Sequence, residues 1–323
     1  MDSKCTMQSL YPEFHPYREF FLDVSDGHSL YVEQSGNPWG IPVLVVHGGP
    51  GGGCSPMTRR FFDPSVYNIT MVDQRGAGKS LPHASLVANT TDKLVADFET
   101  LRTMLKIDSW LLFGGSWGST LSLVYAQMHP QRVRGMILRG IFLGRPQDFQ
   151  WLFEAGGASR IFADYWRDFI SLVPPDQQHN LVAYYYQLLT GKDELRRLAA
   201  AKAWAIWEAH ISTLEPRRIV CETPSDLRDA LAIASIECHY GHHDCFLTDN
   251  QILQNMAAIK DIPGIIVHGR YDMVCPMEQA QLLYDQWPAS ELHIVRDAGH
   301  SQMEPGIIDN LVSATRTFAP KLG

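Results

Sequence analysis

The stretch that decides the fold is Gly114-Gly115-Ser116-Trp117-Gly118. An apolar run at residues 109–113 (SWLLF) comes before it, and residues 119–129 read as a helix that ends before a proline. A strand, a serine flanked by glycines and a helix, in that order, are typical of a nucleophile elbow. Such a turn strains the backbone of its central residue, so the neighbours must be glycines. We therefore predict that Ser116 is a nucleophile whose hydroxyl the turn holds above the edge of the sheet.

Strand and helix patterns alternate on both sides of this turn. Residues 20–24 and 28–34 alternate with period two around an Asp-Gly pair, which predicts a hairpin. Amphipathic helices are expected at residues 91–106 and near 304–318. The alternation implies right-handed crossovers and a mainly parallel sheet. The expected parallel strands are apolar runs at residues 41–46, 67–73, 109–113, 133–138, 262–268 and 291–295.

One long segment interrupts the alternation. Residues 141–250 are helical in pattern, rich in aromatic residues and without strand candidates. A helical block at this point would cover the carboxyl edge of the sheet, where open α/β folds bind ligands. We therefore predict an α/β domain of residues 1–140 and 251–323, with an inserted helical cap domain of residues 141–250.

A serine nucleophile needs a base, and the base needs an orienting acid. Residues 269–272 (GRYD) follow one late strand pattern, and residues 297–300 (DAGH) follow the next. The order Ser116, Asp272, His300 is that of an α/β-hydrolase triad, so we predict these three residues as catalytic.

Other acids and histidines compete for these roles. Asp297 is an alternative acid, although it would have to fold back onto His300 within one short loop. His268 and His293 lie inside strand patterns, where we expect buried, hydrogen-bonded positions.

Two glycine-rich loops follow early strands. Residues 47–53 (HGGPGGG) contain five glycines, and a backbone N–H near Gly49 would complete an oxyanion hole with that of Trp117. A phosphate-binding loop is the competing interpretation, but the lysine and helix that should follow are missing. Residues 73–80 (DQRGAGKS) resemble a P-loop except for Asp73, so we expect a structural turn with an Asp73–Arg75 ion pair.

Composition restricts the functional class. Acidic residues (35 Asp and Glu) outnumber Lys and Arg (27), and the net charge of −8 argues against nucleic-acid or anionic-membrane partners. The sequence shows no signal-peptide run and no transmembrane segment. Six scattered cysteines favour free thiols, so we expect a cytoplasmic protein without cofactor or metal. The sequence assigns no oligomeric state.

Five motifs together resemble the prolyl aminopeptidases (proline iminopeptidases), which are serine peptidases of the α/β-hydrolase fold. The resemblance implies release of N-terminal proline from small peptides through an acyl-enzyme. It spans nearly the whole chain and rests on residues 47–53 (HGGPGGG), 73–80 (DQRGAGKS), 114–119 (GGSWGS), 269–276 (GRYDMVCP) and 298–300 (AGH).

The resemblance also implies residues that bind the substrate. Two cap carboxylates, Glu208 and Glu237, would hold the free α-amino group, and Phe142 and Cys275 would contact the proline ring. This chain departs from the family pattern at three positions, namely Cys238, Gly241 and Phe153.

Three alternatives stay open. Residues 237–245 (ECHYGHHDC) could bind zinc, but the C-x₂-C pairing of a structural site is absent, so we predict loop residues there. A small-substrate esterase or amidase would share the triad without needing Glu208 and Glu237. A ligand receptor of hydrolase fold with little turnover is a third possibility, and the intact triad residues argue against it.

Overall fold

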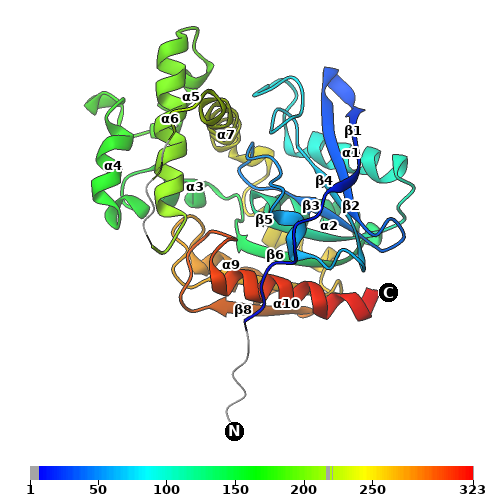
Figure 1. Ribbon diagram of the computed structural model, residues 1–323. Helices are drawn as coiled ribbons and strands as arrows, with labels where there is room; N and C mark the ends of the chain where they lie inside the picture. The colour runs from blue at the N-terminus through cyan, green and yellow to red at the C-terminus, as the bar shows by residue number, and fades with distance from the viewer. Residues whose placement is uncertain (1–6, 216–218, 220, 323) are drawn as a thin grey trace.

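The core of the structure is one twisted sheet that runs through the molecule (Figure 1). The computed structural model describes residues 7–215, 219 and 221–322. In this part of the chain the sheet has eight strands in the order β1-β2-β4-β3-β5-β6-β7-β8. The strands are β1 (Pro16–Asp23), β2 (Ser29–Gly36), β3 (Ile41–Val46), β4 (Tyr67–Val72), β5 (Trp110–Ser116), β6 (Val133–Ile141), β7 (Gly264–Gly269) and β8 (Ser290–Val295).

The strand directions follow from the sequence patterns. Strands β1 and β2 form the predicted antiparallel hairpin, and β2 pairs antiparallel with β4. The remaining neighbours pair in parallel, with β5 between β3 and β6. The prediction of a mainly parallel α/β sheet is therefore confirmed. Because β5 is central, the residue that follows it emerges in the middle of the carboxyl edge of the sheet.

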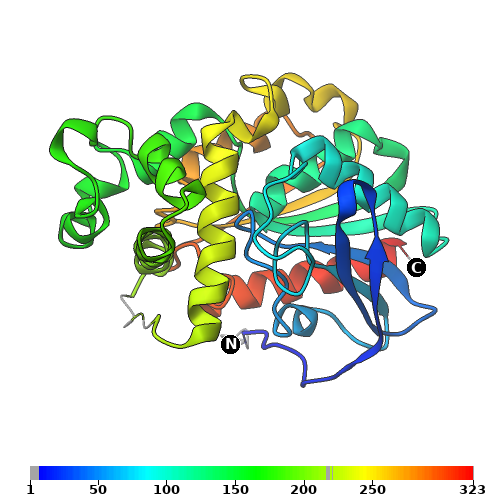
Figure 2. The ribbon, with the colours of Figure 1, turned by 90° about the horizontal axis from the view of Figure 1, so that it is seen from above.

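Helices cover both faces of the sheet (Figures 1 and 2). Helices α1, α2 and α9 pack through one hydrophobic core, and α10 packs on the opposite face through a second core. Sequence reasoning predicted the long helices but missed α9, a short segment after Pro276. The helices are α1 (Thr91–Met104), α2 (Trp117–Met128), α3 (Pro146–Phe153), α4 (Ala163–Ile170), α5 (Leu181–Thr190), α6 (Glu194–Ile211), α7 (Pro224–His242), α8 (Gln251–Gln254), α9 (Met277–Tyr284) and α10 (Pro305–Leu322).

In its described residues the segment between β6 and β7 forms helices joined by turns and loops, with no strand, as predicted. Helices α3 to α7 lie to one side of the sheet (Figure 2). They pack through large aromatic side chains, because Phe153 stacks on Trp204 with ring centroids 3.9 Å apart and Phe169 stacks on Tyr185 at 4.7 Å. These stacks join α3 to α6 and α4 to α5, and Tyr185 packs edge-to-face on Trp204 and so joins α5 to α6.

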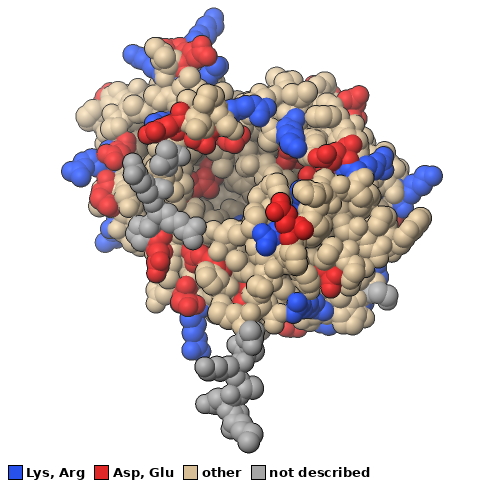
Figure 3. All heavy atoms as spheres, in the orientation of Figure 1, with Lys and Arg blue, Asp and Glu red and all other residues tan. Residues whose placement is uncertain are grey.

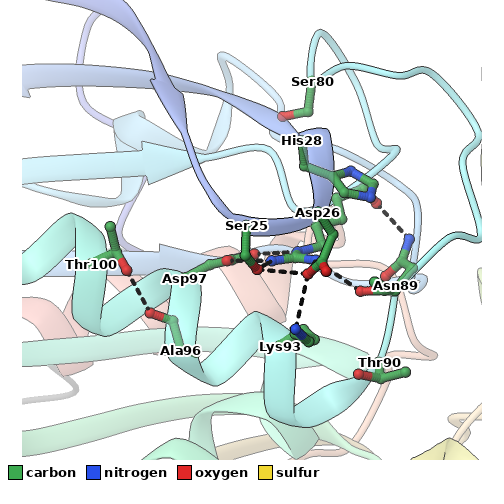
Figure 4. A network of polar contacts seen from close by, with 12 residues as sticks. Ser25, Asp26, His28, Ser80, Asn89, Thr90, Lys93, Ala96, Asp97 and Thr100 are labelled. Atoms are coloured by element: carbon green, nitrogen blue, oxygen red, sulfur yellow. Dashed lines mark hydrogen bonds and ion pairs between the residues drawn. The ribbon is translucent and has the colours of Figure 1, made fainter.

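The expected Asp73–Arg75 ion pair is wrong. Arg75 instead makes two hydrogen bonds to Asp97 on α1, at 2.7 and 2.8 Å, and also contacts Asp26. Figure 4 shows the two carboxylates, Asp26 and Asp97, side by side in this network of polar contacts. Asp73 accepts hydrogen bonds from the backbone N–H groups of Cys54 and Lys79, at 2.7 and 2.8 Å. The turn wraps the Asp73 carboxylate with backbone donors, so no arginine is needed there.

No helix in the described ranges is both long and apolar enough to cross a lipid bilayer.

Candidate active site

Ser116 is the last residue of β5 and the N-cap of α2, and its backbone has a positive φ of 57° with ψ −129°. A side chain at Gly114 would collide with the carbonyl oxygen of Gly118, and one at Gly118 would collide with that of Val46. Glycines at both positions therefore let the turn close against β3. This geometry holds the serine side chain at the carboxyl edge of the sheet and places it at the N-terminus of α2.

Asp272 and His300 come from the loops after β7 and β8, and they meet. The Nδ1 atom of His300 lies 2.7 Å from Oδ2 of Asp272, and both side chains are buried. The other carboxylate oxygen accepts from the N–H groups of Val274 (3.0 Å) and Cys275 (2.7 Å). Burial acts to raise the pKa of Asp272, but His300 and the Cys275 N–H outweigh it and lower the pKa. The carboxyl is thus an anion suited to orient an imidazole.

The competing residues lie elsewhere. Asp297 is exposed, although it is only three residues from His300. His268 is fully buried: its Nδ1 accepts from the Ile141 N–H at 3.1 Å, so its Nε2 carries the proton and donates to the Cys275 carbonyl at 2.8 Å. The expected buried role of His268 is confirmed. The same expectation is wrong for His293, whose side chain is one-third exposed and pairs with Glu291.

Cys275 connects the serine to the Asp–His pair. Ligand atoms of Asp272, Cys275 and His300 all lie within 4.8 Å of one another. Burial and the charge of Asp272 raise the pKa of the Cys275 thiol well above its usual value, while a hydrogen bond with the Ser116 side chain lowers it. Ser116 and His300 therefore both lie beside one neutral thiol. A neutral thiol is a poor nucleophile and a poor metal ligand.

The two candidate oxyanion donors flank Ser116. The Trp117 N–H is at the first position of α2, where the helix offers it no carbonyl acceptor. The glycine loop passes close to the serine, because a side chain at Gly48 would lie 3.3 Å from Cβ of Ser116. Gly49 has φ 110°, which turns the chain back at this point.

Gln74 connects the glycine-rich loop to the side chain of Trp117, a role that sequence reasoning missed. Its amide nitrogen donates to the His47 carbonyl at 2.9 Å, and its amide oxygen accepts from the Trp117 indole at 3.0 Å. The one available signal was its place two residues after the end of β4.

Arg139 and Gly140 at the end of β6 were also missed. Arg139 donates to the carbonyl of His300 at 2.7 Å. A side chain at Gly140 would lie 2.9 Å from Cε1 of His300, so only glycine leaves room for the imidazole.

Glu208 on α6 and Glu237 on α7 are brought together, and Oε2 of Glu237 accepts from the Trp204 indole at 2.7 Å. Burial raises the pKa of Glu208, whereas a hydrogen bond from Glu237 and the nearness of His300 lower it. Burial and the neighbouring Glu208 raise the pKa of Glu237 well above its usual value. Burial and mutual repulsion therefore disfavour two charged carboxylates at this position beside His300.

Phe142 follows β6 and is buried, with its N–H donating to Oγ of Ser119 at 3.1 Å. Its ring packs edge-to-face on Phe149, with centroids 5.4 Å apart. Phe149 in turn occupies the space beside Gly241, where a Cβ would lie 2.6 Å from the ring. Phe142 thus joins the elbow helix, through Ser119, to the aromatic side chains of the helical segment.

The other two departures from the family pattern are also packed. Phe153 stacks on Trp204, and the Cys238 thiol donates to the carbonyl of Val182 at 3.4 Å. The remaining side chains of residues 237–245 do not converge on a zinc site. Cys245 is buried beside Gly144, whereas His242 is exposed and stacks on Tyr186.

Comparison with known proteins identifies the family. A model of the alpha/beta hydrolase fold matches residues 41–306. A proline iminopeptidase of Xylella fastidiosa (strain Temecula1) is 49% identical over 313 residues, which cover 97% of this chain and all of the relative. A proline iminopeptidase of Arabidopsis thaliana is 48% identical over 318 residues, which cover 98% of this chain and 83% of the relative. The chain belongs to the proline iminopeptidase family.

This membership confirms the resemblance that the five motifs indicated. Solved structures agree on the fold of the family. An esterase from Exiguobacterium antarcticum superimposes with a TM-score of 0.60 at 21% identity, covering 94% of this chain and 98% of the esterase. An esterase from Rhodococcus sp. ECU1013 gives a TM-score of 0.56 at 21% identity, covering 95% and 99%. At these identities the likeness extends to the α/β-hydrolase fold alone.

The carboxylate pair predicts a pH-dependent change in stability. The folded pKa of Glu237 lies above its ordinary value of 4.5, so the folded chain binds more protons than the unfolded chain and loses stability as the pH rises above that value. Glu237→Gln keeps an acceptor for Trp204 and removes this loss. We expect it to raise Tm by roughly 1–4 °C at pH 8 and by progressively less toward pH 4.5.

Thermal unfolding across this pH range measures the effect, with Glu13→Gln at an exposed position as the matched control. A Glu237→Gln variant that is less stable than wild type at pH 8 would contradict the raised pKa of Glu237.

Proposed function

We propose that this chain is a serine exopeptidase that releases proline from the N-terminus of small peptides. The observation that carries the proposal is the close pair of Glu208, which is half-buried, and Glu237, which is buried, beside His300. A free α-amino group, with a reference pKa near ~8, is a cation at neutral pH. Two carboxylates that repel each other gain a partner when that cation enters, so they select substrates with a free N-terminus. The names of the relatives point to the same substrate.

The proposed chemistry is acyl transfer through Ser116. The hydroxyl attacks the prolyl carbonyl while Nε2 of His300 takes its proton, and Asp272 stabilises the imidazolium that forms. The N–H groups of Trp117 and Gly49 bind the tetrahedral oxyanion. The C–N bond then breaks, and His300 gives the proton to the leaving amine. Water, activated by the same histidine, hydrolyses the acyl-enzyme and frees proline and Ser116.

The remaining predicted residues shape the site around the proline ring. Phe142 and Cys275 offer buried apolar surface beside the elbow, and the neutral thiol adds no charge there. We propose that residues 141–250 act as a cap domain on a catalytic domain of residues 1–140 and 251–323. A hollow between the helical segment and the sheet, edged by acidic side chains, suits entry of a peptide with a cationic end (Figure 3). A cytoplasmic location fits the free cysteines 54, 221, 238, 245 and 275.

Substitutions separate the triad from its rivals. Ser116→Ala and Asp272→Asn should each lower kcat for a prolyl arylamide by roughly 10⁴-fold or more with folding intact, because they remove the nucleophile and the correct imidazole tautomer. Asp297→Asn, on an exposed neighbour, is the control and should stay near the wild-type rate. Steady-state kinetics and circular dichroism measure both. Near-normal turnover of Ser116→Ala would refute the serine mechanism, and a crippled Asp297→Asn with an active Asp272→Asn would reassign the acid.

Acetylation of the substrate tests the role of the carboxylate pair. Prolyl arylamide should be cleaved well and N-acetylprolyl arylamide hardly at all, because acetylation removes the cation. Glu208→Gln and Glu237→Gln should each lower kcat/KM for prolyl arylamide by about 10- to 100-fold, the worth of a charge-assisted hydrogen bond. Both variants should hydrolyse a small neutral ester at the wild-type rate.

The two other functions predict different outcomes in the same assays. Equal cleavage of the free and acetylated arylamides would favour an esterase or amidase. The absence of a product burst from an activated ester would favour a receptor.

A further inference from the structure

Glu304, just before α10, joins two segments that are far apart in the sequence. Its Oε2 accepts from the N–H of Gly299 at 2.6 Å, and its Oε1 accepts from the N–H of Leu214 at 2.8 Å. The residue is only 6% exposed, and no Lys or Arg of the described chain is within ion-pair distance of it. Both carboxylate oxygens are therefore committed to backbone donors.

Each of these donors is next to a residue of the proposed site. Gly299 directly precedes His300. Leu214 lies three residues beyond the end of α6, the helix that carries Glu208. Glu304 thus connects the loop of the proposed base to the helix of a proposed substrate carboxylate.

Ser212 makes the same connection through its own backbone. Its carbonyl accepts from the N–H groups of His300 (3.0 Å) and Ser301 (2.8 Å). Its hydroxyl donates to the carbonyl of Glu208 at 2.8 Å. The backbone of His300 is therefore anchored four residues after Glu208, and Glu304 holds the two segments together from one side.

The loop that contains Gly299 packs closely against the chain after α6. A Cβ at Gly299 would lie 2.9 Å from the Leu214 nitrogen and 3.3 Å from Oε1 of Glu304. The two segments touch directly, so a change at Glu304 must be passed on to both of them.

We propose that Glu304 is a positioning residue that sets the His300 loop relative to Glu208. The inference rests on the proposed function, in which His300 is the base and Glu208 binds the amine. Without the two hydrogen bonds, the loop of residues 299–301 and the end of α6 lose their common anchor. Misplacement of His300 then lowers kcat, and misplacement of Glu208 raises KM for substrates with a free amine.

Glu304→Gln tests this role, because the amide keeps one acceptor but turns an NH₂ group toward the other backbone N–H. We expect kcat for prolyl arylamide to fall roughly 10- to 100-fold, as for small misplacements of catalytic groups, and KM to rise. Labelling of Ser116 by a fluorophosphonate, which forms a P–O bond and releases fluoride, should slow to a similar extent. Asp297→Asn, in the same loop but exposed, should label like wild type.

A double-mutant cycle separates the two effects. In a Glu208→Gln background, Glu304→Gln should still lower kcat but should no longer change KM, because the amine contact is already lost. Gly299→Ala, which pushes the same two segments apart, should reproduce the kinetic pattern if Glu304→Gln folds poorly.

The outcomes distinguish a failure of the positioning role of Glu304 from a failure of the serine mechanism. If the folded variants have a lower Tm but wild-type kcat, KM and labelling rate at 25 °C, Glu304 is only structural and the positioning role is overturned. If the wild-type chain itself is not labelled at Ser116, the serine mechanism fails instead.

Discussion

Two carboxyl groups that share one site without a protein cation are the constraint on which this structure depends. Glu208, which is half-buried, and Glu237, which is buried, lie within hydrogen-bond reach of each other, and no Lys or Arg in the described part of the chain pairs with either. Such a pair costs stability in its charged form, because desolvation and mutual repulsion both disfavour the two charges. A fold retains an arrangement of this kind when a ligand brings the missing charge, and an N-terminal ammonium group is such a ligand.

The helical segment supplies the rigidity that this arrangement needs. Stacked aromatic rings fix α6 against its neighbours, and the Trp204 indole holds Glu237 in place. The proposed catalytic residues come from the sheet, on the turn at the end of β5 and on the loops after β7 and β8. The sheet and the helical segment are connected by Ser212 and Glu304, which link the His300 loop to the end of α6. In the proposed mechanism, these contacts hold the group that binds the amine and the base that activates Ser116 at a fixed separation.

Local patterns predicted the fold well, because the strands, the nucleophile elbow and the long helices are each determined by a short stretch of sequence. The glycines around Ser116 and the chain order of Asp272 and His300 belong to this class. Contacts between distant residues were not predictable: Arg75 pairs with Asp97 instead of Asp73, and Glu304 bonds to Leu214, 90 residues away. The spacing of Glu208 and Glu237 gave no sign that they meet, and only the family resemblance pointed to them. Helix α9, at eight residues, is too short to show a period.

The central claim is that Glu208 and Glu237 together bind the ammonium group of the substrate. Titration calorimetry of the Ser116→Ala variant, with a prolyl dipeptide and with its N-acetylated form, measures this contact directly. The account predicts binding of the free dipeptide, and binding of the acetylated form weaker by roughly 10-fold or more, because acetylation removes the cation that pairs with the carboxylates. Equal affinity for the two forms would contradict it.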